Sequence, residues 1–295
     1  MARVSFAGLK RAGIALLWFI LCIAVGVVFT IGLTKILPDG GEAWTIPRTG
    51  LIEVVAFGLA TFLVGRLLNK YSWDRMGWGR GGRRDTARSW LRGLALGAVM
   101  ASLAIGLAVI FGARVHVTGD WSAWPRIALP LLLGLILAAL GEELSFRGYP
   151  LRRLADGIGV LPATLLLAVL FGLAHARNPS ASVFSTVNVA LAAIWLSMAF
   201  FSTGGMPLAW GAHFGWNAAL SLLFDAPVSG YIFHVPVVEY TVGAHAWVDG
   251  GAFGPEGGIV STIALLAGTI YLLTRPNAFA PPPESAAVQT EAVPA

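Results

Sequence analysis

The sequence predicts an all-α, polytopic membrane protein with about eight transmembrane helices in one bundle, and two observations lead to this fold class. The first is composition: 57% of the 295 residues are hydrophobic and only 12% are charged, with a mean hydropathy of +0.75. A soluble domain carries roughly twice that charged fraction. The second is a series of apolar runs, each near the ~20 residues that cross a bilayer. The runs cover residues 13–36, 49–69, 92–114, 126–146, 160–177, 184–202, 206–225 and 257–274.

The distribution of basic residues predicts the orientation of these helices. If the N-terminus is cytoplasmic, fifteen of the 20 lysines and arginines fall on the cytoplasmic side. The positive-inside rule then places both termini in the cytoplasm, in agreement with an even number of spans. The basic segment 70–92 is accordingly a cytoplasmic loop, and no nucleic-acid partner is expected. The five basic residues on the outer side are Lys35, Arg48, Arg114, Arg126 and Arg177.

The pattern of runs divides the chain into four parts. Residues 1–125 hold three N-terminal helices and the basic loop, and residues 126–225 hold a core of four helices. Residues 226–275 hold an external loop and the last helix. The Gly-rich loop at 226–256 could cap a cavity, but we expect a plain connector there. The Pro- and Ala-rich tail at 276–295 is expected to be disordered and cytoplasmic.

Polar motifs interrupt the core helices, and ionisable residues inside a membrane are functional candidates by default. In the first motif, Glu142 and Glu143 precede Arg147. Glu143 and Arg147 lie four residues apart with the acid first, the favourable order for an ion pair. Glu142 points about 100° away from Glu143, so it can meet another helix as a general base or metal ligand. A purely structural cluster near the membrane interface is the alternative.

Two further motifs each place a pair of residues one helical turn apart. Phe171 and His175 share one face of the fifth run, and His213 and Asn217 share one face of the seventh. The side chains of His213 and Asn217 can donate hydrogen bonds or ligate a metal. Each pair, taken alone, could be no more than packing or a polar contact between helices.

Taken together, the three motifs predict hydrolysis by an activated water. Two histidines and one carboxylate form a known catalytic-zinc set, here Glu142, His175 and His213. The same groups can act without metal: a glutamate and a histidine activate water, while a histidine and Asn217 stabilise an oxyanion. Because Cys22 is the only cysteine, a zinc–thiolate cluster is excluded.

The motifs resemble those of the CPBP intramembrane proteases, the group that contains the type II CAAX prenyl endopeptidases and the bacteriocin-processing or self-immunity proteins of the Abi family. The resemblance covers about 126–225, with the motifs in the family's order and spacing. The matching residues are Glu142, Glu143 and Arg147 for Glu-Glu-x-x-x-Arg, Phe171 and His175 for Phe-x-x-x-His, and His213 and Asn217 for His-x-x-x-Asn.

The resemblance implies an eight-helix α-fold with a catalytic site between the fourth and seventh spans. It implies that Glu142 activates the water with help from His175, while His213 and Asn217 hold the oxyanion or complete a metal site. Zinc, if used, would be held by Glu142, His175 and His213; a metal-free mechanism is the other option. The residues with supporting roles would be Glu143, Arg147 and Phe171.

The predicted helix boundaries create one geometric conflict. Glu142 would lie at the cytoplasmic end of its helix, and His175 ~22 Å into the next one at 1.5 Å per residue. We therefore expect the stretch 148–162 to sink into the membrane, or the helices to tilt, so that the two residues approach within ~12 Å. Of the other polar residues, Glu53 is expected to snorkel or pair at the interface, and His116 to be a solvated loop residue.

The predicted function is an intramembrane endopeptidase that hydrolyses peptide bonds of membrane-associated peptides or proteins. Its partners would be membrane lipid and a hydrophobic peptide or protein substrate. One alternative is a non-catalytic membrane scaffold or immunity protein of the same fold, and another is a proton-coupled transporter. The Gly-, Ala- and Arg-rich, Lys-poor composition suggests a bacterial cytoplasmic membrane.

Overall fold

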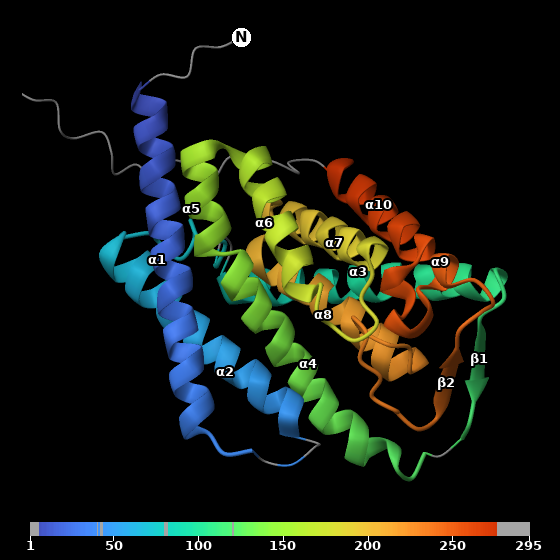
Figure 1. The fold of residues 1–295 in the computed structure, drawn as a ribbon. Helices are drawn as coiled ribbons and strands as arrows, with labels where there is room; N and C mark the ends of the chain where they lie inside the picture. The colour runs from blue at the N-terminus through green and yellow to red at the C-terminus, as the bar shows by residue number, and fades with distance from the viewer. Residues whose placement is uncertain (1–5, 40, 42–43, 80–81, 120, 276–295) are drawn as a thin grey trace, which may run out of the picture.

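The computed structural model describes residues 6–39, 41, 44–79, 82–119 and 121–275, and these residues form a helical bundle (Figure 1). The predicted all-α membrane class is confirmed. Within the described residues the only sheet is a two-stranded antiparallel pair, β1 (Arg114–Val117) and β2 (Val238–Thr241). The tail 276–295, whose disorder was expected, lies outside the described residues.

The N-terminal part contains α1 (Phe6–Ile36), α2 (Thr45–Ala60) and α3 (Gly82–Ile110). A π-helical segment, η2 (Thr61–Leu68), continues α2 without a break. After α3 the chain enters β1, where His116 faces Glu239 of β2 in the strand register. The expectation that His116 lies in a loop is therefore wrong, although its side chain is exposed as expected.

The central part contains α4 (Trp124–Phe146), α5 (Tyr149–Ile158) and α6 (Val160–His175). Between α4 and α5, Gly148 has a backbone φ of 55°, a conformation that residues other than glycine rarely adopt. Gly159, at φ 94°, makes the second sharp break before α6. The stretch 148–162 is thus mostly helix, with the chain reversing between α5 and α6 (Figure 1).

The C-terminal part contains α7 (Val183–Phe201), α8 (Gly205–Ala218) with its π-helical continuation η3 (Ala219–Leu223), and α10 (Ile259–Leu273). Between η3 and α10 the chain forms β2 and three short helices. These are α9 (Ala246–Asp249), η4 (Gly251–Phe253) and η5 (Pro255–Gly257). In Figure 1 this segment and β1 lie at the opposite end of the bundle from the start of α1.

Each predicted apolar run contains a helix, but the number of full-length spans differs from eight. Among the described residues, five helical stretches are long and apolar enough to cross a membrane. They are Phe6–Ile36, Thr45–Leu68, Arg83–Ile110, Trp124–Ile158 and Val183–Phe201. The apolar helices Val160–His175 and Ile259–Leu273 are shorter, and α8 has only 14 residues. Runs read as uniform spans thus differ widely in helical length.

Close backbone contact between α3 and α8 fixes the helix that carries His213. A Cβ on Gly97 would lie 2.0 Å from the carbonyl oxygen of Ala212, and a Cβ on Gly211 would lie 2.2 Å from that of Trp90. Small residues at such positions let transmembrane helices pack backbone to backbone. The glycines of α3 and α8 therefore hold α8 against the bundle at a defined depth.

Candidate functional site

Three of the predicted site residues converge from three helices. The Oε2 atom of Glu142 in α4 lies 3.8 Å from the Nε2 atom of His175 at the end of α6. The same oxygen lies 3.8 Å from the Nε2 atom of His213 in α8. The predicted approach of Glu142 and His175 is therefore confirmed, and the distance is far below the ~12 Å limit set from helix geometry.

The course of α5 explains how Glu142 and His175 meet. We expected the fourth helix to end at residue 146, close to Glu142, but α5 adds 10 residues beyond the break at Gly148. The helical stretch Trp124–Ile158 is 35 residues long, and Glu142 lies near its middle. Because α6 starts beyond Ile158 and returns over 16 residues, His175 comes back to the depth of Glu142.

A buried ionic network supports His213. The Oε1 atom of Glu143 accepts hydrogen bonds from Nη1 of Arg147 and from Nδ1 of His213, both at 2.9 Å. The side chains of Glu143 and Arg147 are 0% and 2% exposed. Arg147 also donates to the carbonyl oxygen of Ala193 in α7 at 3.3 Å. The predicted pair of Glu143 and Arg147 thus forms and links α4, α7 and α8.

Phe171 orients His175 and covers the ionic network. The Nδ1 atom of His175 donates to the carbonyl oxygen of Phe171 at 2.8 Å, and their rings lie 4.5 Å apart. The Phe171 ring also contacts Arg147, whose guanidinium carbon lies 4.7 Å from the centre of the ring. Phe146 packs edge-on against Phe171 at 5.0 Å. This aromatic packing places the Nε2 edge of His175 towards Glu142.

Three hydrogen-bond acceptors face one another at the centre of the cluster. The carboxylate of Glu143 only accepts, so a neutral His213 donates from Nδ1 and keeps a lone pair on Nε2. The carbonyl of Phe171 also only accepts, so the same holds for His175. The Oε2 atom of Glu142 is buried and has no hydrogen-bond partner among the described residues. Separations of 3.8 Å are too long for direct hydrogen bonds.

The cluster lines a cavity of about 460 Å³ that also contains Asn217 and Glu53. Asn217 lies one turn after His213, as predicted. Glu53 does not face the interface as expected, because α2 packs closely on α4 and turns this carboxylate into the cavity. A Cβ on Gly141 would lie 2.6 Å from Cβ of Glu53, so only glycine permits this contact. The cavity therefore holds a second carboxylate beside Glu142.

The loop between η3 and α10 closes one end of this cavity. Glu256 of η5 lines the cavity and accepts a hydrogen bond from Nε1 of Trp216 at 3.0 Å. Its other carboxylate oxygen accepts from the backbone N–H and the hydroxyl of Ser229. Asn188 of α7 donates to the carbonyl oxygen of Glu256 at 2.9 Å. The expectation of a plain connector at 226–256 is therefore wrong.

The electrostatics of Glu256 differ from those of an exposed glutamate. Burial raises the pKa of its carboxyl group, while the donors from Ser229 and Trp216 and the nearby His175 oppose that effect. Because burial dominates, the negative charge of Glu256 is held at a cost in free energy. Neither Glu256 nor Glu53 belongs to a polar motif in the sequence, and both join the site only through tertiary packing.

The expected zinc site is matched by ligand type but not by arrangement. Glu142, His175 and His213 offer one carboxylate and two imidazoles, the donor types of a catalytic zinc. However, the described part of the chain contains no group of three or more His, Cys, Asp or Glu side chains placed to hold a metal ion. Zinc binding by these three residues therefore stays a prediction.

The fold and this cavity define a helical membrane protein with a polar cluster of the kind that hydrolases use. Residues 123–219 match the family model described as type II CAAX prenyl endopeptidase Rce1-like. For residues 123–219, this match confirms the resemblance to the CPBP/CAAX protease family seen in the motifs. No curated protein matches the chain at a significant level. The family match supports a hydrolase activity, namely that of an intramembrane endopeptidase.

Proposed function

We propose that this protein is an intramembrane endopeptidase in which Glu142 activates a water molecule for attack on a peptide bond. The observation that carries the proposal is the convergence of Oε2 of Glu142 with Nε2 of His175 and Nε2 of His213 at 3.8 Å each. A water molecule between these three acceptors donates one hydrogen to Glu142 and the other to a histidine. Such a water is positioned and polarised by the residues of the family motifs.

The proposed steps use only side chains of this cavity. Glu142 takes a proton from the water as the water oxygen attacks the carbonyl carbon of the peptide bond. The side-chain amide of Asn217 donates to the oxyanion that forms, as donors in an oxyanion hole do. Glu142 then passes the proton to the departing amine nitrogen. Glu143 and Arg147 keep the ring of His213 fixed through its Nδ1 atom.

We also propose an orientation that limits the class of substrate. The positive-inside rule places the basic segment around α3's start and both termini in the cytoplasm. The cavity is closed by segments at the other end of the bundle, such as the start of α2 and the loop with Ser229 and Glu256 (Figure 1). Its substrates are then membrane-embedded or extracytoplasmic peptide segments, rather than the C-termini of cytoplasmic proteins.

Cleavage by purified protein tests the catalytic proposal. Wild-type protein in detergent should cleave members of a hydrophobic reporter-peptide library, and Glu142→Gln should lower the rate by about 10²–10⁴-fold because it removes a general base. Glu239→Gln, an acid-to-amide change on exposed β2, is the matched control. No cleavage by wild type, or equal cleavage by Glu142→Gln, would favour the scaffold reading over an enzyme.

Metal content measured on the same preparations separates the two hydrolytic mechanisms. A metal-free mechanism predicts cleavage that resists chelators and substoichiometric zinc in the wild-type protein. Near-stoichiometric zinc that disappears in His175→Ala and in His213→Ala, together with cleavage, would instead assign these histidines as zinc ligands.

Labelling of single cysteines in intact cells tests the orientation. With the native cysteine replaced, as in Cys22→Ala, His245→Cys should react with a membrane-impermeant maleimide from outside. Arg84→Cys should react only after the cells are opened. The reverse pattern would place the cavity on the cytoplasmic side and restore cytoplasmic C-termini as substrates.

A further inference from the structure

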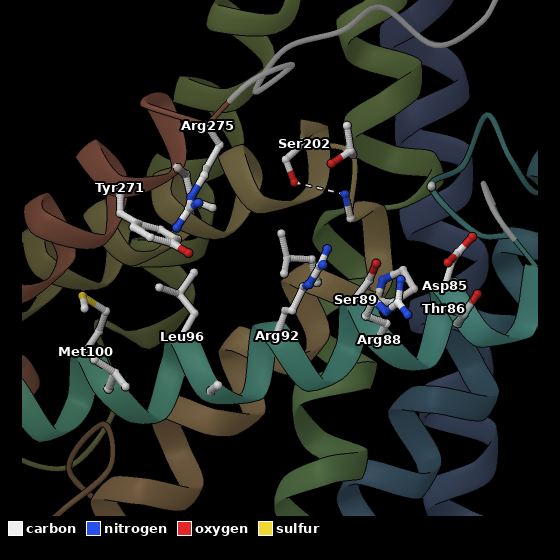
Figure 2. A pocket seen from close by; sticks show the side chains of 18 of the residues that line it. Asp85, Thr86, Arg88, Ser89, Arg92, Leu96, Met100, Ser202, Tyr271 and Arg275 are labelled. Carbon is white, nitrogen blue, oxygen red and sulfur yellow. Dashed lines mark hydrogen bonds between the residues drawn. The ribbon is translucent and has the colours of Figure 1, made fainter.

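A second and larger cavity lies at the end of the bundle away from η5. Its volume is about 880 Å³, and it is formed by α3, the connection between α7 and α8, and the end of α10 (Figure 2). None of the predicted catalytic residues lines it. A role for this cavity is therefore separate from the proposed peptide hydrolysis.

Three arginines surround this cavity. Arg88 and Arg92 lie one turn apart on α3, and Arg275 follows the end of α10. Figure 2 shows Arg92 and Arg275 extending into the same space, one from α3 and the other from the segment that follows α10. The guanidinium carbon of Arg275 lies 4.2 Å from the centre of the Tyr271 ring, which holds this side chain at the cavity wall. The arginine side chains thus converge on one volume from two sides.

The positive charge in this cavity is not compensated within the described residues. None of the three arginines forms an ion pair with an acidic side chain in the part of the chain that the structure describes. Asp85 is the one carboxylate among the lining residues, against three guanidinium groups. Like charges brought together in this way repel one another unless an anion lies between them. The arrangement therefore calls for an anionic ligand.

Beyond the arginines and the hydroxyl groups of Thr86, Ser89, Ser202 and Thr203, part of the cavity wall is apolar, and this part limits the class of anion that fits. Past Arg92 the exposed face of α3 continues with Leu96, Val99 and Met100, and Leu272 faces them from α10. The cavity therefore has a cationic mouth and an apolar interior along the helix axis. A phosphate group with an attached acyl chain fits both parts of the cavity. The guanidinium groups pair with the phosphate oxygens, and the hydrocarbon chain packs on the apolar wall.

We propose that this arginine cavity binds a phosphate-bearing anion, with the headgroup of an anionic phospholipid as its source. In the proposed orientation it lies on the cytoplasmic side, where anionic lipids meet basic pockets between transmembrane helices. The phosphate lies between Arg88, Arg92 and Arg275, and an acyl chain follows the apolar face of α3. A free phosphate has the same headgroup chemistry but makes no use of the apolar wall.

Native mass spectrometry of the intact detergent-purified protein tests this site. Phosphatidylglycerol should remain bound to the wild type after activation in the gas phase, and phosphatidylcholine should not. The double variant Arg92→Gln/Arg275→Gln should bind phosphatidylglycerol at least about tenfold more weakly, the effect of losing a charge-assisted hydrogen bond. Arg83→Gln/Arg84→Gln also removes two positive charges, at the start of α3 and outside the cavity, and should bind as the wild type does.

Further arms of the experiment decide between sources of the anion and test the role of the charge. Inorganic phosphate titrated into the wild type should compete only at far higher concentration than the lipid; competition at equal concentration would replace the lipid by a soluble phosphate. Arg92→Lys keeps the positive charge but not the guanidinium fork, so it should bind phosphatidylglycerol more strongly than the double variant does; binding as weak as that of the double variant would overturn the role given to the charge. Equal retention of both lipids, or an equal loss in Arg83→Gln/Arg84→Gln, would overturn the proposal.

Discussion

The cavity around Glu142 and the cavity around Arg92 lie in one helix bundle, yet they balance their charges differently. Around Glu142, the ionic partners come from the chain itself, because Glu143 binds both Arg147 and His213. Around Arg92, the guanidinium groups find no acidic partner among the described residues. The first cavity holds its polar groups in place before a ligand arrives, whereas the second leaves its exposed arginines free to pair with water or with a ligand.

This contrast distinguishes charged residues that the fold needs for stability from charged residues that are available to bind a ligand. A buried charge without a partner costs several kcal/mol, so the chain must supply its own partner in the interior. An exposed charge costs little, because water or lipid headgroups screen it. Burial and pairing should therefore decide which arginines the fold needs, and substitution of one arginine from each cavity tests that rule.

The largest effect on stability is expected for Arg147→Met, and Arg92→Met is its exposed counterpart. Removing Arg147 leaves Glu143 buried without its cation and should destabilise the protein by about 3–5 kcal/mol. Removing the exposed Arg92 should change the free energy of unfolding by no more than about 0.5 kcal/mol. Thermal unfolding in detergent, followed by tryptophan fluorescence, measures both effects.

The double variant Glu143→Gln/Arg147→Met controls for the size of the new side chain. It removes both charges and should recover part of the stability lost in Arg147→Met, because no uncompensated charge remains. If Arg147→Met and Arg92→Met unfold at the same temperature, pairing in the interior does not determine which arginine the fold requires.

The motif residues of the site could be predicted from the sequence because local spacing reports their chemistry. Helical periodicity placed Glu143 beside Arg147, and three motifs in otherwise apolar helices indicated that Glu142, His175 and His213 meet. The depth at which they meet could not be predicted, because α5 extends the helical stretch beyond Gly148 and hydropathy alone does not reveal this break and extension.

The residues missed by the sequence analysis enter the site through long-range contacts. Glu53 reaches the cavity only because Gly141 of α4 allows α2 to approach. Glu256 reaches it because Asn188 and Trp216, distant in sequence, hold its backbone and side chain. A lone acid in a Gly- and Pro-rich loop is a weak signal, since such loops usually carry solvated charges. Packing of the whole bundle decides these positions.

Removal of one negative charge from each cavity, at Glu256 and at Asp85, should have different effects. Glu256→Gln keeps one acceptor oxygen but turns an amide N–H towards the donors of Trp216 or Ser229. The loss should be about 1–3 kcal/mol, the cost of leaving a buried donor unsatisfied. Asp85→Asn removes the one acidic group of the arginine cavity and should leave unfolding unchanged while strengthening the binding of phosphatidylglycerol.

The pH dependence of stability offers a separate test of Glu256. Burial raises its pKa in the folded protein, so the folded state holds this proton more tightly than the unfolded state does. Stability from this group is then present below the ordinary glutamate pKa of about 4.3 and falls as pH rises towards the raised value. The difference between wild type and Glu256→Gln should show this slope, and a difference that is constant with pH would contradict it.

The last prediction concerns the glycine that lets Glu53 into the cavity. In Gly141→Ala the new methyl group would lie 2.6 Å from Cβ of Glu53 and 3.3 Å from the backbone nitrogen of Val54, so α2 and α4 must separate. Overpacking of this kind costs about 1–3 kcal/mol, and peptide cleavage should fall because α4 also carries Glu142. Gly58→Ala is the matched control, because a Cβ on Gly58 meets nothing within 4 Å.

A second-site change distinguishes the steric contact from a general effect of alanine at position 141. Glu53→Gly removes the Cβ that the methyl group meets, so Gly141→Ala/Glu53→Gly should lose less stability than the two single changes added together. Additive losses would mean that α2 and α4 do not meet at these two residues. The coupling, measured by thermal unfolding and by peptide cleavage in parallel, then shows whether the spacing of α2 and α4 also sets the position of Glu142.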